Sequence, residues 1–523
     1  MDKKTFWNLI YGLILLVTVT AEILAILAVK RLNMLPDGYM AVFIGVLALF
    51  ALGIGLLLFL KGKKSGKGRR IAACVLAVVV ICGCVALRTV ALDIVETLQL
   101  TSQDTLEITT REVYVLSDDP ALELADAHNY TFGYIKEYDV DCTAQVLNEI
   151  QMQTGAEVIT AGYTDIYAMA KAFLEGRLDA MILNGGIISI LEDLEEFEEF
   201  SDHARVLAQI RVFETNEASA AIPEQNEKEP VAAETEAAAE KETEPKEEEI
   251  NFSELKPFAV YVSGSDSRDT EIVKNSRSDV NILAIVNPLT KQVLLINTPR
   301  DYYIPNWAGG YQLDKLTHCG VYGTKCSMKT LGHLYGVDVE YFVRINFTGF
   351  KKMIDALGGV TVYSDYEFMA IERTQIQVGE NTLDGQGALD FARERKRVPG
   401  GDADRGRHQM KVITAVIEKA TSGTTIINNY SEIMESVEGM FEMNVPTELI
   451  SVLMKMQLSD MARWNIVSFS ATGYGDKGEC YSAPGMELSV MKPNYSSVNK
   501  ASRLIDMVFA GELLTEEVIN SIT

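Results

Sequence analysis

The stretch FAVYVSGSDSR, residues 258–268, passes from an apolar run to glycine, serine and charged residues. Two further apolar runs, at 280–286 and 293–296, are bordered in the same way, by RSD at 277–279 and by PRD at 299–301. Short apolar runs are typical of buried strands, and open α/β folds place ligand sites where strands end. The region therefore predicts a sheet with charged residues gathered at its strand ends.

Downstream residues alternate between expected strands and helices. A strand at 341–347 leads into a helix at 350–357, and helical spacing returns at 383–391 and 407–420. Alternation of this kind indicates helices packed on a sheet. We expect residues 251–523 to form an α/β/α layered catalytic domain with a mixed sheet.

The N-terminal part of the chain is strongly apolar. Runs at 7–29 and 39–60 each reach the roughly 20 residues that a bilayer requires, and a third run, at 71–87, is near the lower limit of about 17. A signal peptide would be a single short apolar segment. Residues 1–92 are therefore expected to form three transmembrane helices.

Basic residues predict the orientation of these helices. The connection at 61–70 is rich in lysine and arginine, and Lys3 and Lys4 precede the first helix, so both are expected in the cytoplasm. Lys30 and Arg31, in the first connection, are a weaker contrary signal. The chain is thus expected to be a multi-pass cell-membrane protein of a Gram-positive-type envelope, with its N-terminus in the cytoplasm and its catalytic domain on the extracellular side of the membrane.

Two segments separate the membrane helices from the catalytic region. Residues 100–214 alternate strand-like and helical runs, which predicts a small βαβ-type accessory domain with a parallel sheet outside the cell. Residues 215–250 are dominated by glutamate and contain no aromatic residue, which predicts an acidic disordered linker. The net charge of −26 argues against nucleic acid as a partner.

Cysteine usage leaves the redox state open. Cys319 and Cys326 are close enough in sequence to form a disulfide in an oxidising exterior, and free thiols are the alternative. No CxxC motif or His/Cys spacing indicates zinc.

The carboxylates and arginines at the expected strand ends predict a site for a pyrophosphate. Asp266 and Asp279 could share one hard cation, for which oxygen ligands are preferred. A guanidinium matches phosphate oxygens with a planar fork. In an extended segment, Arg393 and Arg395 would point to the same face and Glu394 away from it. The candidates for phosphate binding are Arg277, Arg300, Arg393, Arg395 and Arg405, with Arg268 as a weaker one.

These motifs, taken in order, resemble a known family. SGSDSR, RSD, NTPRD, KLTHCG, ALGGV, LDGQGALDFARER and GDADRGRHQ follow one another as in the LytR-CpsA-Psr family, and three membrane segments with an accessory domain are similar to its capsule-linked subgroup. The resemblance implies a magnesium-dependent phosphotransferase (manganese is possible). It would transfer a glycopolymer, such as teichoic acid, capsule or another wall polysaccharide, from a polyprenyl-pyrophosphate carrier to peptidoglycan.

The resemblance also implies roles for individual residues. Asp402 would be the general base that takes the proton of the incoming sugar hydroxyl, with Asp404 as a competing candidate or a helix cap. His408 departs from the arginine often found before the final glutamine, and we leave it outside the site. The implied metal ligands are Asp266 and Asp279, the catalytic residues Asp402, Arg393, Arg395 and Arg405, and the substrate-binding residues Arg277, Arg300, Gln409 and Arg268.

Two other functions fit the same residues. A regulator could bind the polyprenyl-pyrophosphate without chemistry, although it would not need Asp402 or the two metal ligands. A pyrophosphatase would use water in place of the sugar hydroxyl. The expected partners are the lipid-linked glycan, peptidoglycan and the membrane, together with a possible complex with polymer export machinery.

Overall fold

The computed structural model describes most of the chain. The described residues are 3–60, 67–101, 108–136, 140–192, 194–213, 255–265, 275–371, 374–422, 433, 436–437 and 439–522. The acidic segment expected to be a linker lies outside the described residues, as do Asp266 and Arg268.

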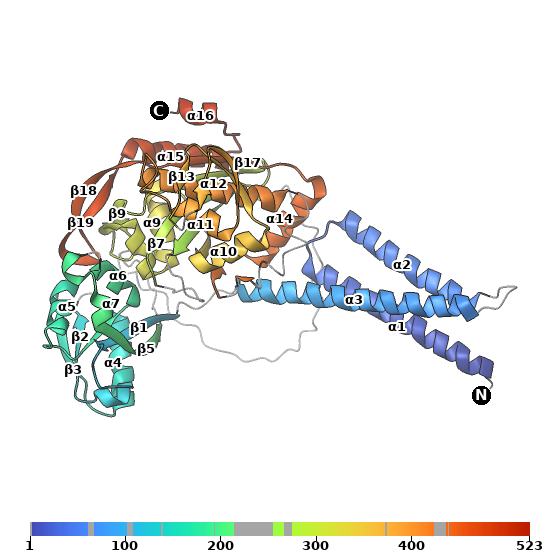
Figure 1. The fold of residues 1–523 in the computed structure, drawn as a ribbon, viewed down its shortest axis with the longest axis horizontal. Helices are drawn as coiled ribbons and strands as arrows, with labels where there is room; N and C mark the ends of the chain where they lie inside the picture. Colours follow the sequence, from blue (N-terminus) through green and yellow to red (C-terminus); the bar gives the residue numbers. More distant parts are fainter. Residues whose placement is uncertain are drawn as a thin grey trace, which may run out of the picture.

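Three N-terminal helices form an elongated arm at one end of the molecule (Figure 1). They are α1 (Lys3–Leu32), α2 (Asp37–Phe59) and α3 (Lys67–Thr101). Each contains a window apolar enough to cross a membrane, with mean hydropathy of 2.5, 2.8 and 2.6. The expectation of three apolar helices is confirmed, and α3 extends beyond the apolar run that predicted it.

The accessory region contains a five-stranded sheet in the order β3-β2-β4-β1-β5. Strands β3, β2 and β4, which run from one edge of the sheet to its centre, are parallel to one another as expected. The sheet is nevertheless mixed, because β1 runs antiparallel to both β4 and β5. The bounds are β1 (Ile108–Leu116), β2 (Thr131–Ile135), β3 (Ile159–Tyr163), β4 (Ala180–Leu183) and β5 (Ala204–Phe213), with helices η1 (Leu124–Ala127), α4 (Val140–Thr154), α5 (Ile166–Leu174), η2 (Gly185–Ile187), α6 (Ile188–Leu191), η3 (Glu195–Phe197) and α7 (Phe200–His203).

The catalytic region is built on a six-stranded sheet in the order β16-β11-β6-β7-β8-β17. β6 and β11 are parallel, as are β8 and β17, whereas β6, β7 and β8 form an antiparallel meander. The mixed sheet expected from the sequence is therefore confirmed. The strands are β6 (Phe258–Ser265), β7 (Ser278–Asn287), β8 (Gln292–Asn297), β11 (Tyr341–Asn346), β16 (Phe441–Met443) and β17 (Asn465–Ser470).

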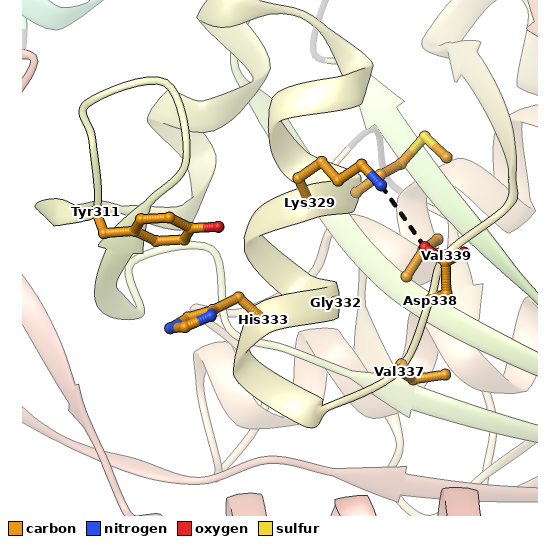
Figure 2. A pocket seen from close by; sticks show the side chains of 8 residues that line it. Tyr311, Lys329, Gly332, His333, Val337, Asp338 and Val339 are labelled. Carbon is orange, nitrogen blue, oxygen red and sulfur yellow. Dashed lines mark ion pairs between the residues drawn. The ribbon is translucent and has the colours of Figure 1, made fainter. Parts of the chain in front are cut away.

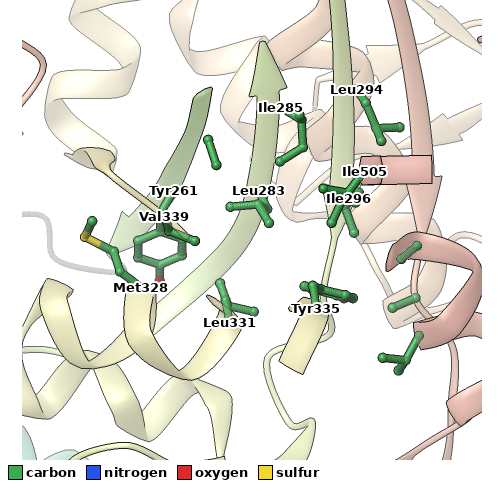
Figure 3. Close-up of a cluster of buried hydrophobic side chains, with 14 of the residues drawn as sticks. Tyr261, Leu283, Ile285, Leu294, Ile296, Met328, Leu331, Tyr335, Val339 and Ile505 are labelled. Carbon is green, nitrogen blue, oxygen red and sulfur yellow. The ribbon is translucent and has the colours of Figure 1, made fainter. Parts of the chain in front are cut away.

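Helices cover both faces of this sheet because neighbouring strand residues alternate between two cores. Ala259 and Tyr261 face the core beneath α9 and α15, part of which is drawn in Figure 3. Phe258 and Val260 face the opposite core, which includes Met410 of α12. Both faces are buried, which explains the continuous apolar runs of these strands. The helices are α8 (Leu316–Cys319), η5 (Gly320–Tyr322), α9 (Thr324–Tyr335), α10 (Phe347–Ala356), α11 (Gly385–Arg393), α12 (Asp402–Thr421), α14 (Thr447–Asp460), α15 (Tyr495–Phe509) and α16 (Glu516–Ser521).

Short hairpins complete the catalytic region. One of them, β18–β19, extends from the main body to the accessory domain (Figure 1). The strands are β9 (Tyr303–Asn306) with β10 (Gln312–Lys315), β12 (Val360–Ser364) with β15 (Gly379–Leu383), β13 (Phe368–Met369) with β14 (Gln375–Ile376), and β18 (Gly473–Cys480) with β19 (Ala483–Pro493).

The arm of helices contacts the catalytic region through a small apolar cluster. Met34, between α1 and α2, and Ile94 of α3 pack with Met443 and Val445. Lys455 of α14 also donates a hydrogen bond to the side chain of Asn33. The connection between α1 and α2 therefore lies at the same end of the arm as the catalytic region.

The buried core beneath α9 and α15 gives a stability prediction. Leu294 of β8 is fully buried there, so Leu294→Ala should lower the free energy of unfolding by about 2–5 kcal/mol through lost contacts and a cavity. Leu289, in the β7–β8 turn, is 54% exposed and is the matched control. Leu289→Ala should change the free energy of unfolding by about 0.5 kcal/mol or less. Thermal unfolding of the full chain in detergent measures both, and equal shifts would contradict the assignment of this core.

Candidate active site

The candidate site begins where β7 and β8 meet. Asp279 is the second residue of β7, and Arg300 follows the end of β8, which runs antiparallel to β7. Arg300 Nη1 donates to Asp279 Oδ1 over 2.7 Å. Arg300 also lies 3.6 Å from Asp301, which in turn lies 3.8 Å from Lys315. The pairing of β7 with β8 thus brings the RSD and PRD motifs together.

The N-terminus of α12 lies against the same strand ends. A Cβ at Gly406 would lie 2.2 Å from the side-chain amide of Asn297, the last residue of β8, so a larger residue there would displace the Asn297 side chain. The approach places Asp402 and Arg405 in the first turn of the helix, where Arg405 Nη2 is 2.8 Å from Asp402 Oδ1. The helix begins at Asp402, earlier than the expected start at 407.

The electrostatics join these groups into one charged cluster, which we define as Asp279, Arg300, Arg395, Asp402 and Arg405. Burial lowers the pKa of Arg405, and the positive charges of Arg300 and Arg395 lower it further, against the opposing effect of Asp402 and Asp279. Burial alone would also lower the pKa of Arg300, but Asp279, Asp301 and Asp402 raise it above its usual range. Arginine stays protonated in either case, so these partly buried cations are available to an anionic ligand.

The arginines around Glu394 are arranged differently from the sequence expectation. Arg393 is the last residue of α11, and its guanidinium lies 4.3 Å from the centre of the Phe347 ring. Glu394 is buried and accepts the backbone N–H groups of Arg395, Lys396 and Arg397 at 3.0, 2.8 and 3.0 Å. The expected strand-like alternation is wrong here because the helix continues to Arg393 and a carboxylate-capped turn follows it.

Asp404 and His408 have structural surroundings. The Asp404 carboxylate is buried, accepts the N–H of Gly400 over 2.5 Å and pairs with Arg407. His408 stacks on Phe391 with ring centres 4.1 Å apart, and its Nδ1 lies 3.1 Å from the Phe391 carbonyl oxygen. Gln409, next to it on α12, is also largely buried. Asp402, rather than Asp404, therefore belongs to the charged cluster.

The structure does not place every predicted site residue. Arg277 directly precedes β7, close in sequence to Asp279. Asp266 and Arg268 lie outside the described residues, so only one of the two expected metal ligands is placed. Cys319 and Cys326 are both buried free thiols, and burial together with the Cys326 side chain raises the pKa of Cys319.

One buried cation near the site was missed at the level of sequence. Arg344 of β11 is 2% exposed, and its Nη2 donates to the carbonyl and the hydroxyl oxygen of Ser276 over 3.3 and 2.7 Å. A single arginine within the otherwise apolar run YFVRI (341–345) was the available signal. It holds the segment that leads to Asp279.

A second missed feature is a buried polar network beneath the β18–β19 hairpin. Asp314 Oδ1 lies 2.7 Å from His318 Nδ1 and 3.0 Å from Ser482 Oγ, and the Cys480 thiol is close by. Burial and the Asp314 carboxylate raise the pKa of that thiol to about 12. Two ligands of a tetrahedral zinc ion, each about 2.0 Å from the metal, would lie roughly 3.3 Å apart. The distances from Asp314 to His318 and to Ser482 are shorter than this. They are therefore hydrogen-bond distances, and these bonds fix the hairpin.

A pocket beside α9 is separate from the charged cluster. It lies between α9 and the segment after it, and an ion pair of 3.6 Å joins Lys329 to Asp338 at its edge (Figure 2). Tyr311 and His333 line it with apolar side chains, and no residue of the charged cluster contributes. We therefore place the candidate active site at the cluster and not in this pocket.

The fold and the cluster together define a class of protein. Three apolar helices carry an α/β/α domain whose strand ends bring carboxylates and partly buried guanidiniums together. Guanidinium groups pair with phosphate oxygens through strong charge-assisted hydrogen bonds. The class is a membrane-anchored α/β protein with a site suited to a phosphorylated ligand.

Comparisons with known proteins name the family. The LytR_cpsA_psr family model matches residues 225–495, more than half of the chain. The chain belongs to the LytR_cpsA_psr family.

Relatives with curated names share its catalytic region. The chain is 33% identical over 205 residues to an Enterococcus faecalis protein named polyisoprenyl-teichoic acid–peptidoglycan teichoic acid transferase TagU, covering 39% of this chain and 65% of that protein. The TagU protein of Oceanobacillus iheyensis is 31% identical, with 44% of this chain and 72% of that protein covered. The solved structure of B. subtilis TagU is 26% identical, covers 50% of this chain and 100% of that one, and gives a TM-score of 0.39. The chain thus spans slightly less than two thirds of the Enterococcus protein.

The aromatic stack around His408 predicts a pH dependence of stability. Burial, with Lys411 nearby, lowers the pKa of His408 to about 4 from its ordinary 6.5. Between these values the unfolded chain binds a proton that the folded chain does not, so stability rises with pH through this window and is level above it. The contribution of His408 to this change in the free energy of unfolding is about 3 kcal/mol, at roughly 1.4 kcal/mol per pKa unit.

His408→Phe keeps the stacking and removes the titration, so this variant should lose less stability than the wild type between pH 7 and pH 4. Thermal unfolding at a series of pH values measures the difference. His128→Phe, at an exposed site, should retain the wild-type slope. A His408→Phe slope equal to that of the wild type would contradict the assignment.

Proposed function

We propose that this protein transfers a glycopolymer (teichoic acid, capsular or another wall polysaccharide) from a polyprenyl-pyrophosphate carrier to peptidoglycan. The observation that carries the proposal is the charged cluster, in which two partly buried arginines lie beside Asp279 and Asp402. Membership of the family and the names of its relatives, which are teichoic acid transferases, support the choice of reaction.

The reaction would be a phosphoryl transfer to a sugar hydroxyl. The acceptor oxygen forms a bond to the glycan-linked phosphorus, the bond from that phosphorus to the bridging oxygen breaks, and polyprenyl phosphate leaves. Asp402 takes the hydroxyl proton. Arg300, Arg395 and Arg405 stabilise the charge that spreads over the phosphoryl oxygens, with Arg393 completing the catalytic set. The residues that would bind the carrier's pyrophosphate are Arg277, Arg300, Gln409 and Arg268.

Asp266 and Asp279 would hold the magnesium or manganese ion of this site. Asp279 fits that role because its carboxylate offers the hard oxygen donors that these cations prefer, and it lies at a strand end beside Arg300. The bound cation would neutralise charge on the pyrophosphate.

We further propose that the catalytic domain works on the outer face of the cell membrane, in a complex with polymer export machinery. The connection between α1 and α2 lies with the catalytic region, whereas Arg69 and Arg70 lie at the start of α3, at the opposite end of the arm (Figure 1). There the Arg70 guanidinium lies 5.0 Å from the Tyr11 ring, near the N-terminus. Connections rich in lysine and arginine lie preferentially in the cytoplasm. The end of the arm that contacts the catalytic region would then lie on the outer side of the membrane.

The proposed reaction predicts a metal-dependent product. The full chain in detergent, given a short synthetic polyprenyl-pyrophosphate glycan and a peptidoglycan oligomer, should form a phosphodiester-linked glycan with magnesium and none with a chelator. Mass spectrometry of the oligomer measures it. Free glycan phosphate without linkage would indicate hydrolysis instead, and tight lipid binding without any product would indicate a regulator.

The position of Asp402 predicts a selective loss of turnover. Asp402→Asn removes the proposed base, so kcat should fall by about 10²–10⁴ while the folded state persists. Asp404→Asn is the matched control because its carboxylate is buried against Gly400 and Arg407. It should lower the thermal unfolding temperature more than Asp402→Asn does. A larger loss of kcat in Asp404→Asn, at equal stability, would instead assign the role of base to Asp404 and the structural role to Asp402.

A further inference from the structure

The accessory domain shares a hydrophobic core with the catalytic domain. Phe173 of α5 and Ile190 of α6 belong to the same buried cluster as Val321, Met486 and Val490 of the catalytic region. The hairpin β18–β19 reaches α5 in this way (Figure 1). The two domains are therefore packed together through buried apolar side chains, and their contact fixes the position of one relative to the other.

A tight turn after β4 of the accessory domain makes the polar part of this contact. Asn184 is 2% exposed, and its side-chain oxygen accepts the N–H of Gly186 over 3.0 Å. Its amide nitrogen donates to the carbonyl oxygen of Val321 over 2.7 Å. One buried side chain therefore shapes the turn and binds it to the catalytic domain.

The same turn lies directly against the segment that enters β7. A Cβ at Gly186 would lie 2.3 Å from the carbonyl oxygen of Asn275. A Cβ at Gly320 would lie 2.6 Å from the carbonyl oxygen of Ser276 and 2.9 Å from the nitrogen of Ser278. Glycine on both sides thus lets three backbone segments pack without side chains between them.

Other contacts hold this entry segment (275–278) from inside the catalytic domain. Arg344 donates to Ser276, and the Ser278 hydroxyl lies 3.0 Å from the Tyr261 hydroxyl and 2.8 Å from Ser263 Oγ. The residue that follows is Asp279, whose carboxylate accepts from Arg300. A displacement of the entry segment would therefore move a carboxylate of the charged cluster.

We propose that the Asn184–Gly186 turn of the accessory domain is a positioning element of the active site, which holds residues 275–278 so that Asp279 meets Arg300. The turn touches no reacting atom and acts through the Asn184 hydrogen bond to Val321 and the close backbone contact of Gly186 with Asn275. The effect on turnover rests on the proposed phosphoryl transfer, whereas the effect on the entry segment does not. The accessory domain accordingly helps to hold the active site of the catalytic domain in its working geometry.

Gly186→Ala in the full chain tests the proposal, because the added methyl group meets backbone that cannot rotate away. Hydrogen exchange followed by mass spectrometry should show faster exchange in peptides covering residues 275–282, by about fivefold or more. The transfer assay should show kcat reduced by about 10- to 100-fold, the range expected for a small displacement of catalytic groups, with a smaller change in KM. Asn184→Ala, which removes the bond to Val321 and the acceptor for the Gly186 N–H but adds no methyl group against the entry segment, should shift both readouts in the same direction by less.

Ile150→Val is the matched control. Ile150 of α4 is fully buried in the core on the other face of the accessory sheet, so the variant lowers the stability of this domain without touching the turn. It should leave exchange at 275–282 and kcat at wild-type values. Equal changes in Ile150→Val and Gly186→Ala would overturn the proposal, as would unchanged exchange at 275–282 in Gly186→Ala.

Failure of the proposed function gives a different result. A wild-type chain that forms no linked product would refute the transferase assignment, while the exchange measurement would still decide whether the turn holds the entry segment. Should Gly186→Ala fail to fold, Asn184→Ala and Ile150→Val carry the same comparison, and wild-type exchange at 275–282 in Asn184→Ala overturns the proposal.

Discussion

The ion pair between Arg300 and Asp279 is the interaction on which the site depends. A guanidinium that is partly removed from water needs a compensating charge, because an unpaired buried charge is strongly unfavourable. The antiparallel pairing of β7 with β8 supplies that charge by placing Asp279 beside the segment that carries Arg300. Gly406 then lets α12 approach the end of β8, which adds Asp402 and Arg405. The charged cluster is therefore a consequence of strand register and of one close helix approach.

The fold could be predicted where burial leaves a strong mark on the sequence. The runs at 258–262, 280–286 and 293–296 are apolar, apart from Asn281, because helices cover both faces of the sheet. The strands β1 and β5 were not singled out in the sequence, and they pair antiparallel with each other. Their pairing depends on residues far apart in the chain, which no local pattern reports.

The site was predictable to the extent that its residues belong to ordered motifs. Asp279, Arg300, Asp402 and Arg405 were singled out in the sequence, and the structure brings them together. The extended conformation assumed for residues 393–395 was wrong, because α11 continues to Arg393 and the Glu394 carboxylate closes the turn that follows. Residues that support the site left little signal in the sequence beyond the single arginine within the strand at 341–346. Arg344 and the Asp314–His318–Ser482 network acquire their roles only from partners distant in sequence.

The apolar contact of Met34 and Ile94 with Met443 and Val445 affects how a lipid-linked donor would reach the catalytic region. It joins the catalytic region to the ends of the membrane helices, so the domain cannot drift far from the bilayer surface. A lipid-linked donor would then arrive by lateral diffusion in two dimensions, and its encounter rate would follow its surface density instead of a bulk concentration. Dilution of the donor with inert lipid would slow such an encounter even at a constant total amount.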